Sequence, residues 1–597
     1  MPLYENRFHA ENKITVSEET RRQAVFGTGL VLSQIAEQLK AGKNIVADSW
    51  YGVDWAGILE KILEMAPDAG TIKAGELFLP ASEIQSYKQK FITDDPGFGY
   101  ANLDGKLTDI MDETAIREAA QKLESGKGIL VYGSGAAVKE LADTADFVYY
   151  FDMTRQPLLW QMWDGKLIPF AQESPKADYN WKEYYYCDYY LLDHQKNQVL
   201  TCMDYYVEAI DAEDLKMVSK PAYEEIVKTM LKYPVKEVKI YQPGPWGAYR
   251  YRDLWDVPGL ECNAWNELAG PELSILIDFG GDKPLNIPFM ALMQYPEEFV
   301  GPYLSENLPG MFPLDVWLDD GYFPEKEPAE RISMPIHTHP STDYIKRHFN
   351  EPLGRYETYY IAEAYEGANT WLGYQEDADL EEWERKCRES NNLTPISDWK
   401  EYMTQFESNV GDLYLIPPGT AHGHGGNQMV LEMDTCPSIS GTEYSFFEYD
   451  FARNSWDDET KTMTGKPVKM HLEHGFDMEK WRRGNWAKEH LLPKARVIKW
   501  TKEYYLDRFD SLPEMPFEIE RMHFFRRAEN DTEKKFAHIL TLTVGKKVII
   551  CSKEDPSRTA ELDLFQSCTI PAGFGPYEII NPDGGHSTVV SLRWKKG

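Results

Sequence analysis

The segment GDLYLIPPGTAH, residues 411–422, carries the most specific pattern in this chain of 597 residues. Five residues separate Gly411 from Pro417, one separates Pro417 from Gly419, and two separate Gly419 from His422. Glycine and proline at these places shape turns around the short strand-like run LYLI. The spacing therefore predicts a β-rich region in which the imidazole projects from the next strand toward the interior.

Three side chains upstream of this segment complete a set of metal ligands. In MPIHTHP, residues 334–340, His337 and His339 lie two apart, so on a strand they point to the same face, about 7 Å apart. The run ETYYIAEA begins with Glu357. Imidazole and carboxylate ligands suit zinc and similar divalent transition metals, and zinc is the ion we expect. The predicted ligands are His337, His339, Glu357 and His422.

Each ligand also has a plainer interpretation. The pair at 337 and 339 can lie in a turn before Pro340, Glu357 can be an exposed strand carboxylate, and His422 can cap the PPGT turn. His424 repeats the HxH spacing with His422, but the glycines beside it favour a loop. The order and spacing of the four residues favour the metal site.

The order of the segments resembles the class I mannose-6-phosphate isomerases of the cupin superfamily. Between residues 246 and 456 the chain reads WGAYRYRDLWD, PIHTHP, GRYETYYIAEA, VGDLYLIPPGTAH and SFFEYDFARNSW, in that order. The resemblance implies cupin jelly-roll domains, a divalent metal such as zinc, and a sugar phosphate substrate. It also implies an aldose–ketose isomerase, which would interconvert mannose 6-phosphate and fructose 6-phosphate or a related pair.

The chain departs from the family pattern at several positions. His337 stands where the family usually has glutamine, and Arg355 replaces a lysine, which keeps the charge but not the proton-transfer ability of an amine. The arginine of the family's closing motif has no counterpart in residues 444–448, although Arg453 follows downstream. By resemblance, we predict Arg355 and Arg453 as catalytic residues.

The remaining parts of an isomerase site have weaker signals. Lys346 and Arg347 are the predicted contacts of the substrate phosphate, and the base is left open among Asp343, Glu448 and Asp450. Because the closing arginine is missing, the chain has an alternative function as a catalytically altered, metal-binding cupin that binds sugar or regulates. Redox chemistry at iron or nickel is a further alternative, for which the flanking sequence gives no specific support.

The first part of the chain alternates strand-like runs, such as NIVADS and GILVYG, with the amphipathic run WAGILEKILEM. This alternation predicts a doubly wound α/β domain. Its order resembles small-molecule kinases of the uridine-kinase type. However, the turn DSWYGVDWAG, residues 48–57, lacks the lysine and hydroxyl of the phosphate-binding loop GxxxxGK[ST], so we predict a degenerate, P-loop-kinase-like domain. A kinase that feeds the isomerase would have to bind ATP without that lysine.

The predicted fold class is multidomain, α/β plus β. The predicted parts are a degenerate kinase-like α/β domain at 1–225, a metal-binding cupin domain with a helical insertion at 226–465, and a second cupin-like β domain at 466–597.

Charge and composition exclude several classes of partner. A net charge of −34 repels phosphate backbones and anionic lipids, so we expect neither nucleic-acid nor membrane binding. No apolar run reaches the length of a membrane span, and the first residues lack the apolar core of a signal peptide. The seven cysteines form no CxxC pair, which favours reduced thiols. We therefore expect a cytoplasmic protein; the oligomeric state is left open.

Overall fold

The structure is a computed structural model. It describes residues 4–7, 10–95, 97–176, 181–242, 248–254, 265–322, 334–450, 455–457, 462–464 and 469–595. The chain forms two compact units: unit 1 comprises residues 1–10, 231–271 and 292–597, and unit 2 comprises residues 11–230 and 272–291. The three-part division at residues 225 and 465 stays a prediction.

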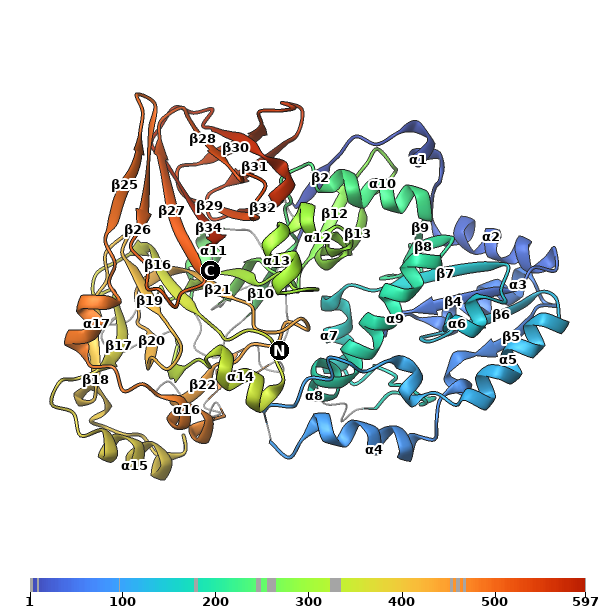
Figure 1. Cartoon of the computed structure of the whole chain (residues 1–597), viewed down its shortest axis with the longest axis horizontal. Helices are drawn as coiled ribbons and strands as arrows, with labels where there is room; N and C mark the ends of the chain where they lie inside the picture. Colours follow the sequence, from blue (N-terminus) through green and yellow to red (C-terminus); the bar gives the residue numbers. More distant parts are fainter. Residues whose placement is uncertain are drawn as a thin grey trace. The chain divides into compact units, whose positions relative to one another are not determined.

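Unit 2 is built on a mixed sheet with the strand order β3-β9-β8-β7-β4-β6-β5 (Figure 1). The parallel strands are β4 (Ile45–Ser49), β5 (Gly70–Lys73), β6 (Ile129–Tyr132), β7 (Phe147–Asp152) and β8 (Tyr205–Glu208). The antiparallel edge consists of β9 (Lys216–Ser219) and β3 (Ala24–Phe26). A small second sheet has the order β13-β12-β2, formed by β13 (Leu285–Pro288), β12 (Ser274–Asp278) and β2 (Glu11–Lys13).

Helices cover both faces of the larger sheet. On one face, α2 (Thr28–Lys40) and α3 (Trp55–Met65) bury apolar residues at helical spacing, among them Ile35 and Ile58. On the other face, α9 (Tyr189–Cys202) sends Lys196 to Asp152 at the end of β7, 2.6 Å away. The other helices of unit 2 are α1 (Glu18–Arg22), α4 (Ala81–Ile92), α5 (Glu113–Ser125), α6 (Lys139–Ala142), α7 (Arg155–Trp163), α8 (Trp181–Glu183) and α10 (Lys220–Met230).

The glycine turn after β6 is closed by a carboxylate of the chain itself. Asp48, at the end of β4, accepts hydrogen bonds from the backbone N–H groups of Gly135 (2.8 Å) and Ala137 (2.9 Å) and from the Gln195 amide (2.7 Å). β4 lies between β7 and β6, where the order of the strands changes direction, and ligands of open α/β sheets bind at such points. The two N–H groups of the turn after β6 are occupied by the chain itself. The likeness to a P-loop kinase stays a prediction.

Unit 1 contains two facing antiparallel sheets that position the candidate site. The first has the order β1-β10-β11-β14-β21-β16-β19, formed by β1 (Tyr4–Asn6), β10 (Lys239–Gln242), β11 (Trp265–Ala269), β14 (Leu314–Asp320), β21 (Gln428–Thr435), β16 (Glu357–Ala364) and β19 (Leu413–Ile416). The second has the order β18-β17-β20-β15-β22, formed by β18 (Met403–Glu407), β17 (Asn369–Tyr374), β20 (His422–His424), β15 (Ile336–Thr338) and β22 (Phe446–Tyr449).

The C-terminal part of unit 1 forms a second β-sandwich around a core that includes Met522, Leu540 and Val589. One sheet consists of β25 (Ala495–Trp500), β26 (Tyr504–Phe509), β27 (Phe517–Phe524), β34 (Ser587–Trp594), β29 (His538–Val544) and β32 (Ser567–Ile570). The other consists of β28 (Arg527–Asp531), β33 (Pro576–Ile580), β30 (Lys547–Ser552) and β31 (Thr559–Asp563). The predicted mixture of α/β structure and β-sandwich structure is confirmed.

Short elements connect and cover these sheets. The helices of unit 1 are α11 (Arg250–Leu254), α12 (Pro296–Phe299), α13 (Pro302–Asn307), α14 (Thr342–Phe349), α15 (Leu380–Ser390), α16 (Leu472–Met478) and α17 (Gly484–His490), and a hairpin is formed by β23 (Ser455–Asp457) and β24 (Thr462–Thr464). The predicted helical insertion contains α15, whose Trp383 packs in a buried aromatic cluster with Trp399 and Tyr402.

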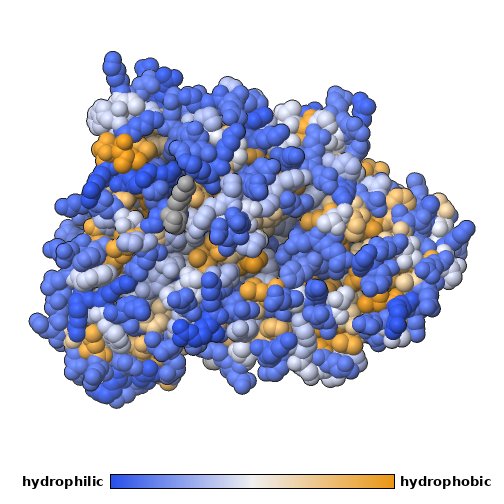
Figure 2. Space-filling view, viewed as in Figure 1, coloured by the Kyte–Doolittle hydropathy of each residue, from blue (hydrophilic) through white to orange (hydrophobic). Residues whose placement is uncertain are grey.

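The surface is mainly polar. Figure 2 shows hydrophilic residues over most of the face in view, with small separate hydrophobic patches. None of the described helices has the length and hydrophobicity needed to span a bilayer. No disulfide joins the six cysteines that the structure describes.

Replacement of Gly301 tests the packing of the C-terminal sandwich. Gly301 has φ +97°, and an added Cβ would overlap the backbone carbonyl oxygen of Lys535. We expect Gly301→Ala to lower the free energy of unfolding by about 2–5 kcal/mol, because backbone strain and overpacking add. Gly584 is the control, with φ +70° and nothing within 4 Å of the added atom, so Gly584→Ala has only the backbone cost of about 1 kcal/mol. Equal losses in urea unfolding would contradict this expectation.

Candidate metal centre

Both facing sheets of unit 1 contribute side chains to one buried group. His337 on β15 pairs directly with His422 on β20 across two strands of the same sheet, and His339 follows β15 by one residue. Glu357 is the first residue of β16 in the opposite sheet. None of the four is more than 1% exposed, and one ligand atom from each lies within 4.8 Å of the others. The structure thus brings the four predicted ligands together.

Backbone carbonyls fix the tautomer of all three histidines. The Nδ1 atoms of His337, His339 and His422 lie 2.9, 2.8 and 2.9 Å from the carbonyl oxygens of Pro335, Tyr444 and Thr420, respectively. A carbonyl oxygen only accepts, so each Nδ1 carries a proton and Nε2 is the nitrogen that is left to face a ligand. This is the arrangement in which histidine binds a metal through Nε2.

The Nε2 atoms converge on the Glu357 carboxylate. Oε2 of Glu357 is 2.6 Å from Nε2 of His339 and 2.7 Å from Nε2 of His422, and Nε2 of His337 has no hydrogen-bond partner among the described residues. At these distances a proton or a metal ion has to lie between the ring nitrogens and the carboxylate. The donors present, three nitrogens and one carboxylate, fit a divalent transition metal.

Burial keeps the imidazoles in the form that binds a metal. Desolvation lowers the pKa of His337 well below its usual value, and the neighbouring His422 and His339 lower it further. Desolvation also lowers the pKa of His339 well below its usual value, and Arg355 adds to the effect. Both rings therefore stay neutral in mildly acidic solution.

His424 lies outside the group of four. It shares β20 with His422, and its Nδ1 is 2.6 Å from the carbonyl oxygen of Gly425. Burial lowers the pKa of His424 to about 4. The Tyr359 ring contacts both imidazoles, with centroids 5.6 Å from His422 and 5.9 Å from His424.

The predicted catalytic Arg355 is buried and already paired. Its Nη2 atom donates to Glu432 (2.7 Å) and Asp434 (2.8 Å), both on β21. Its Nη1 atom lies 3.6 Å from the carboxylate of Glu443. The arginine thus holds two carboxylates beside the metal group. The predicted Arg453 lies outside the described residues.

The other predicted contacts are at the surface. Lys346 and Arg347 are exposed on α14, as is Asp343, and none of these side chains belongs to the buried group.

The two other candidate bases are buried. Glu448 follows Phe447 on β22, and the Phe447 ring lies 5.5 Å from the ring of His337. Because neighbouring residues of a strand point to opposite faces, Glu448 points away from His337 and accepts a hydrogen bond from the Tyr374 hydroxyl (3.2 Å). Asp450 is buried just after β22.

Sequence reasoning missed Glu432 and Asp434. Together with Glu357 they form a second group, with one carboxylate oxygen from each within 4.8 Å of the others. The signal was present in QMVLEMDT, where two carboxylates alternate with Leu431 and Met433 along a strand that is buried throughout. Burial raises the pKa of Glu432, and the charge of Glu357 raises it further.

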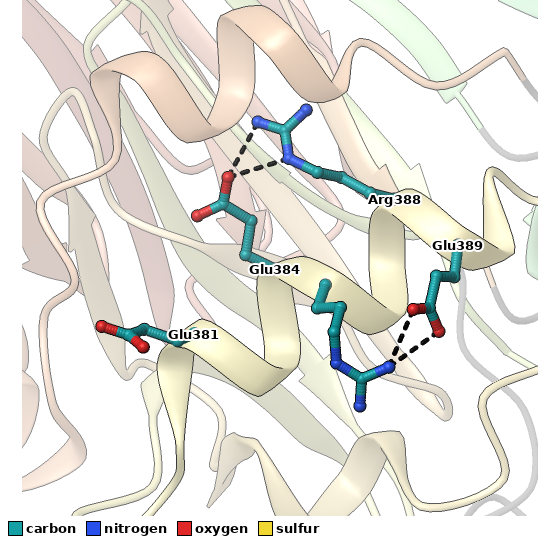
Figure 3. A pocket seen from close by; sticks show the side chains of 5 residues that line it. Glu381, Glu384, Arg388 and Glu389 are labelled. Carbon is teal, nitrogen blue, oxygen red and sulfur yellow. Dashed lines mark hydrogen bonds and ion pairs between the residues drawn. The ribbon is translucent and has the colours of Figure 1, made fainter.

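A surface hollow on α15 contains no comparable site. Figure 3 shows Glu384 and Arg388 one helical turn apart, joined at 2.8 Å, and Glu389 in a similar pair with Arg385. Exposed pairs of this spacing stabilise a helix by about 0.2–0.5 kcal/mol. We interpret this face as a solvated helix surface.

Comparisons with known proteins give two separate results. A family model described as "Domain of unknown function (DUF8485)" matches residues 31–232. The chain is 26% identical over 145 residues to mannose-6-phosphate isomerase of Streptococcus mutans, a match that covers 24% of this chain and 39% of that protein. It is 28% identical over 168 residues to the probable mannose-6-phosphate isomerase GmuF of Bacillus subtilis, covering 28% and 44%. Each match thus spans less than half of the relative.

Comparison with solved structures also finds mannose 6-phosphate isomerases, at low structural similarity. The mannose 6-phosphate isomerase of Bacillus subtilis has a TM-score of 0.44 and 19% identity, covering 60% of this chain and 99% of that one. A putative mannosephosphate isomerase of Archaeoglobus fulgidus has a TM-score of 0.41 and 16% identity, covering 61% and 97%.

Removal of one imidazole tests the metal group. We expect His422→Ala to weaken metal binding at least about 100-fold, since it removes a nitrogen donor directly. His424→Ala is the matched control, because His424 lies on the same strand but outside the group. Metal content after dialysis, measured by mass spectrometry, compares them. Equal retention by the two variants would show that the ion is not held here.

The histidine pKa values predict how stability varies with pH. A histidine in the unfolded chain takes up a proton below about pH 6.5, whereas His337 and His339 in the folded chain do not. The free energy of unfolding of the metal-free protein therefore falls as pH drops below about 6.5, by up to about 1.4 kcal/mol per pH unit for each histidine. Urea unfolding from about pH 8 to pH 5 measures the slope. We expect a shallower slope for His337→Gln; an unchanged slope would contradict the assignment.

Proposed function

We propose that unit 1 is a metal-dependent aldose–ketose isomerase acting on mannose 6-phosphate or a related sugar phosphate. The observation that carries the proposal is the convergence of His337, His339, His422 and Glu357 between two sheets, in a chain similar in sequence to mannose-6-phosphate isomerases. We propose zinc as the ion, because imidazole nitrogen and carboxylate oxygen are donors that zinc binds in proteins.

An isomerase of this kind moves a proton between C1 and C2 of the sugar through an enediol-like intermediate. A divalent metal bound at the four ligands would supply Lewis-acid polarisation of the substrate oxygens. Arg355 is the cation nearest these ligands in the described chain, since it lowers the pKa of both His339 and Glu357. We assign it electrostatic stabilisation of the oxyanion that develops as the proton moves.

Two of the side chains that we assign to the substrate phosphate are exposed on α14. Lys346 and Arg347 lie in the last turn of α14, the helix that begins three residues after His339. We propose them, with Arg453, as the groups that bind the substrate phosphate. The protein as a whole is proposed to work in the cytoplasm, with no nucleic-acid or membrane partner.

A sugar-binding or regulatory protein is the second candidate. This candidate is favoured by the ion pairs of Arg355 with Glu432 and Asp434, because a guanidinium that is paired within the chain is not free to stabilise a reacting substrate. Such a protein would bind the metal and a sugar without turnover. For unit 2 we propose a degenerate kinase-like domain without nucleotide chemistry, supported by the lack of the P-loop lysine and hydroxyl in the turn at residues 48–57.

An assay coupled to fructose 6-phosphate tests the isomerase. We expect turnover of mannose 6-phosphate to disappear after chelation and to return with Zn²⁺, because the ion polarises the reacting oxygens. Glu357→Gln should lower kcat/KM at least about 100-fold. His424→Ala is the control and should keep the activity.

The same assay separates the two candidates. Metal-loaded protein that binds mannose 6-phosphate in calorimetry but does not convert it would reject the isomerase and favour the sugar-binding alternative.

A further inference from the structure

A second group of carboxylates adjoins the four metal ligands on the same face of one sheet. In the ladders of β14, β21 and β16, Asp315 lies opposite Asp434, and Tyr359 lies opposite Glu432. Directly opposed residues share a face, as do residues two apart on one strand. The face therefore carries five carboxylates from three adjacent strands: Asp315, Asp319, Glu357, Glu432 and Asp434.

These five side chains are all buried. None is more than 3% exposed. Glu357, Glu432 and Asp434 each bring one oxygen within 4.8 Å of the others. Asp319 lies diagonally across the ladder from Glu432 on the same face, because Trp317 pairs with Glu432 and Asp319 pairs with Val430. Buried carboxylates at this density are stable only with cations or protons between them.

Several of the carboxylate oxygens have only other carboxyls beside them. Among the described residues, no nitrogen or hydroxyl donor reaches either oxygen of Asp319 or Oδ1 of Asp434, and the carboxyl of Glu432 is the neighbour of both side chains. Arg355 takes Oδ2 of Asp434 and Oε1 of Glu432, so it uses one oxygen of each. The oxygens without such a donor belong to side chains at most 1% exposed, which points to a missing ligand.

The charges around the group favour a further cation. Five buried carboxylates share one guanidinium, that of Arg355, which also lies 3.6 Å from the carboxylate of Glu443. One divalent ion at the histidines does not balance these carboxylates when they are ionised, so the others need further cations or protons.

We propose a second cation site, held by Asp319, Glu432 and Asp434, with Glu357 shared between the two ions. Its donors are all oxygens, so it selects a hard cation such as Mn²⁺ or Mg²⁺, whereas the nitrogen-rich site selects zinc. Shared carboxylates are typical of two-metal sites with ions about 3.5–4 Å apart. The proposal extends the metal centre proposed above and does not depend on isomerase activity.

Stoichiometric titration of the full chain tests the second site. Protein stripped by a chelator is titrated with Mn²⁺, with and without one equivalent of Zn²⁺, and free Mn²⁺ is followed by electron paramagnetic resonance. We expect one Mn²⁺ to bind per zinc-loaded chain. Asp319→Asn and Glu432→Gln should each weaken Mn²⁺ binding at least about 10-fold while the zinc content is unchanged. Asp315→Asn, on the same strand and face but outside the ligand group, is the matched control.

The outcomes separate this inference from the proposed function. Zinc-loaded wild-type protein that takes up no Mn²⁺ would overturn the second site, even if it is an active isomerase. Unchanged Mn²⁺ affinity in both Asp319→Asn and Glu432→Gln would also overturn it. Mn²⁺ uptake that is lost in these two variants but kept in Asp315→Asn supports the site, even if mannose 6-phosphate is not converted.

Discussion

The convergence of three imidazole Nε2 atoms on one buried carboxylate is the constraint on which the candidate site depends. Three backbone carbonyls accept the Nδ1–H groups of His337, His339 and His422, so Nε2 of each ring is left to face the group. Burial lowers the pKa of His337 and His339 and so opposes their protonation. A bound cation would take the place that a proton otherwise has to fill between the rings and the carboxylate.

The two facing sheets explain why these residues meet. His337 and His422 are direct neighbours across two strands of one sheet, while Glu357 comes from the other sheet. The pairing register fixes which face of the sheet each side chain occupies. A shift of one residue along a strand would turn the ligands of that strand to the opposite face. The Arg355 side chain, two residues before Glu357, uses the same face to hold Glu432 and Asp434.

Local patterns in the sequence were sufficient for part of this picture. The HxH pair, Glu357 and the turn before His422 identified the four residues that converge, because strand alternation and turn chemistry are local properties. Partners that depend on register were missed: the pairing of Arg355 with Glu432 and Asp434 requires β21 beside β16. The orientation of Glu448 away from His337 likewise depends on the pairing of β22 with β15.

In unit 2, the Asp48 carboxyl group competes with any anion from solution for the glycine turn after β6. Asp48 is covalently part of the chain, so it faces the N–H groups of Gly135 and Ala137 at a high effective concentration. An anion from solution would have to displace this side chain before it could reach the two N–H groups. The turn after β6 is thus held in shape by the chain itself, without a bound ligand.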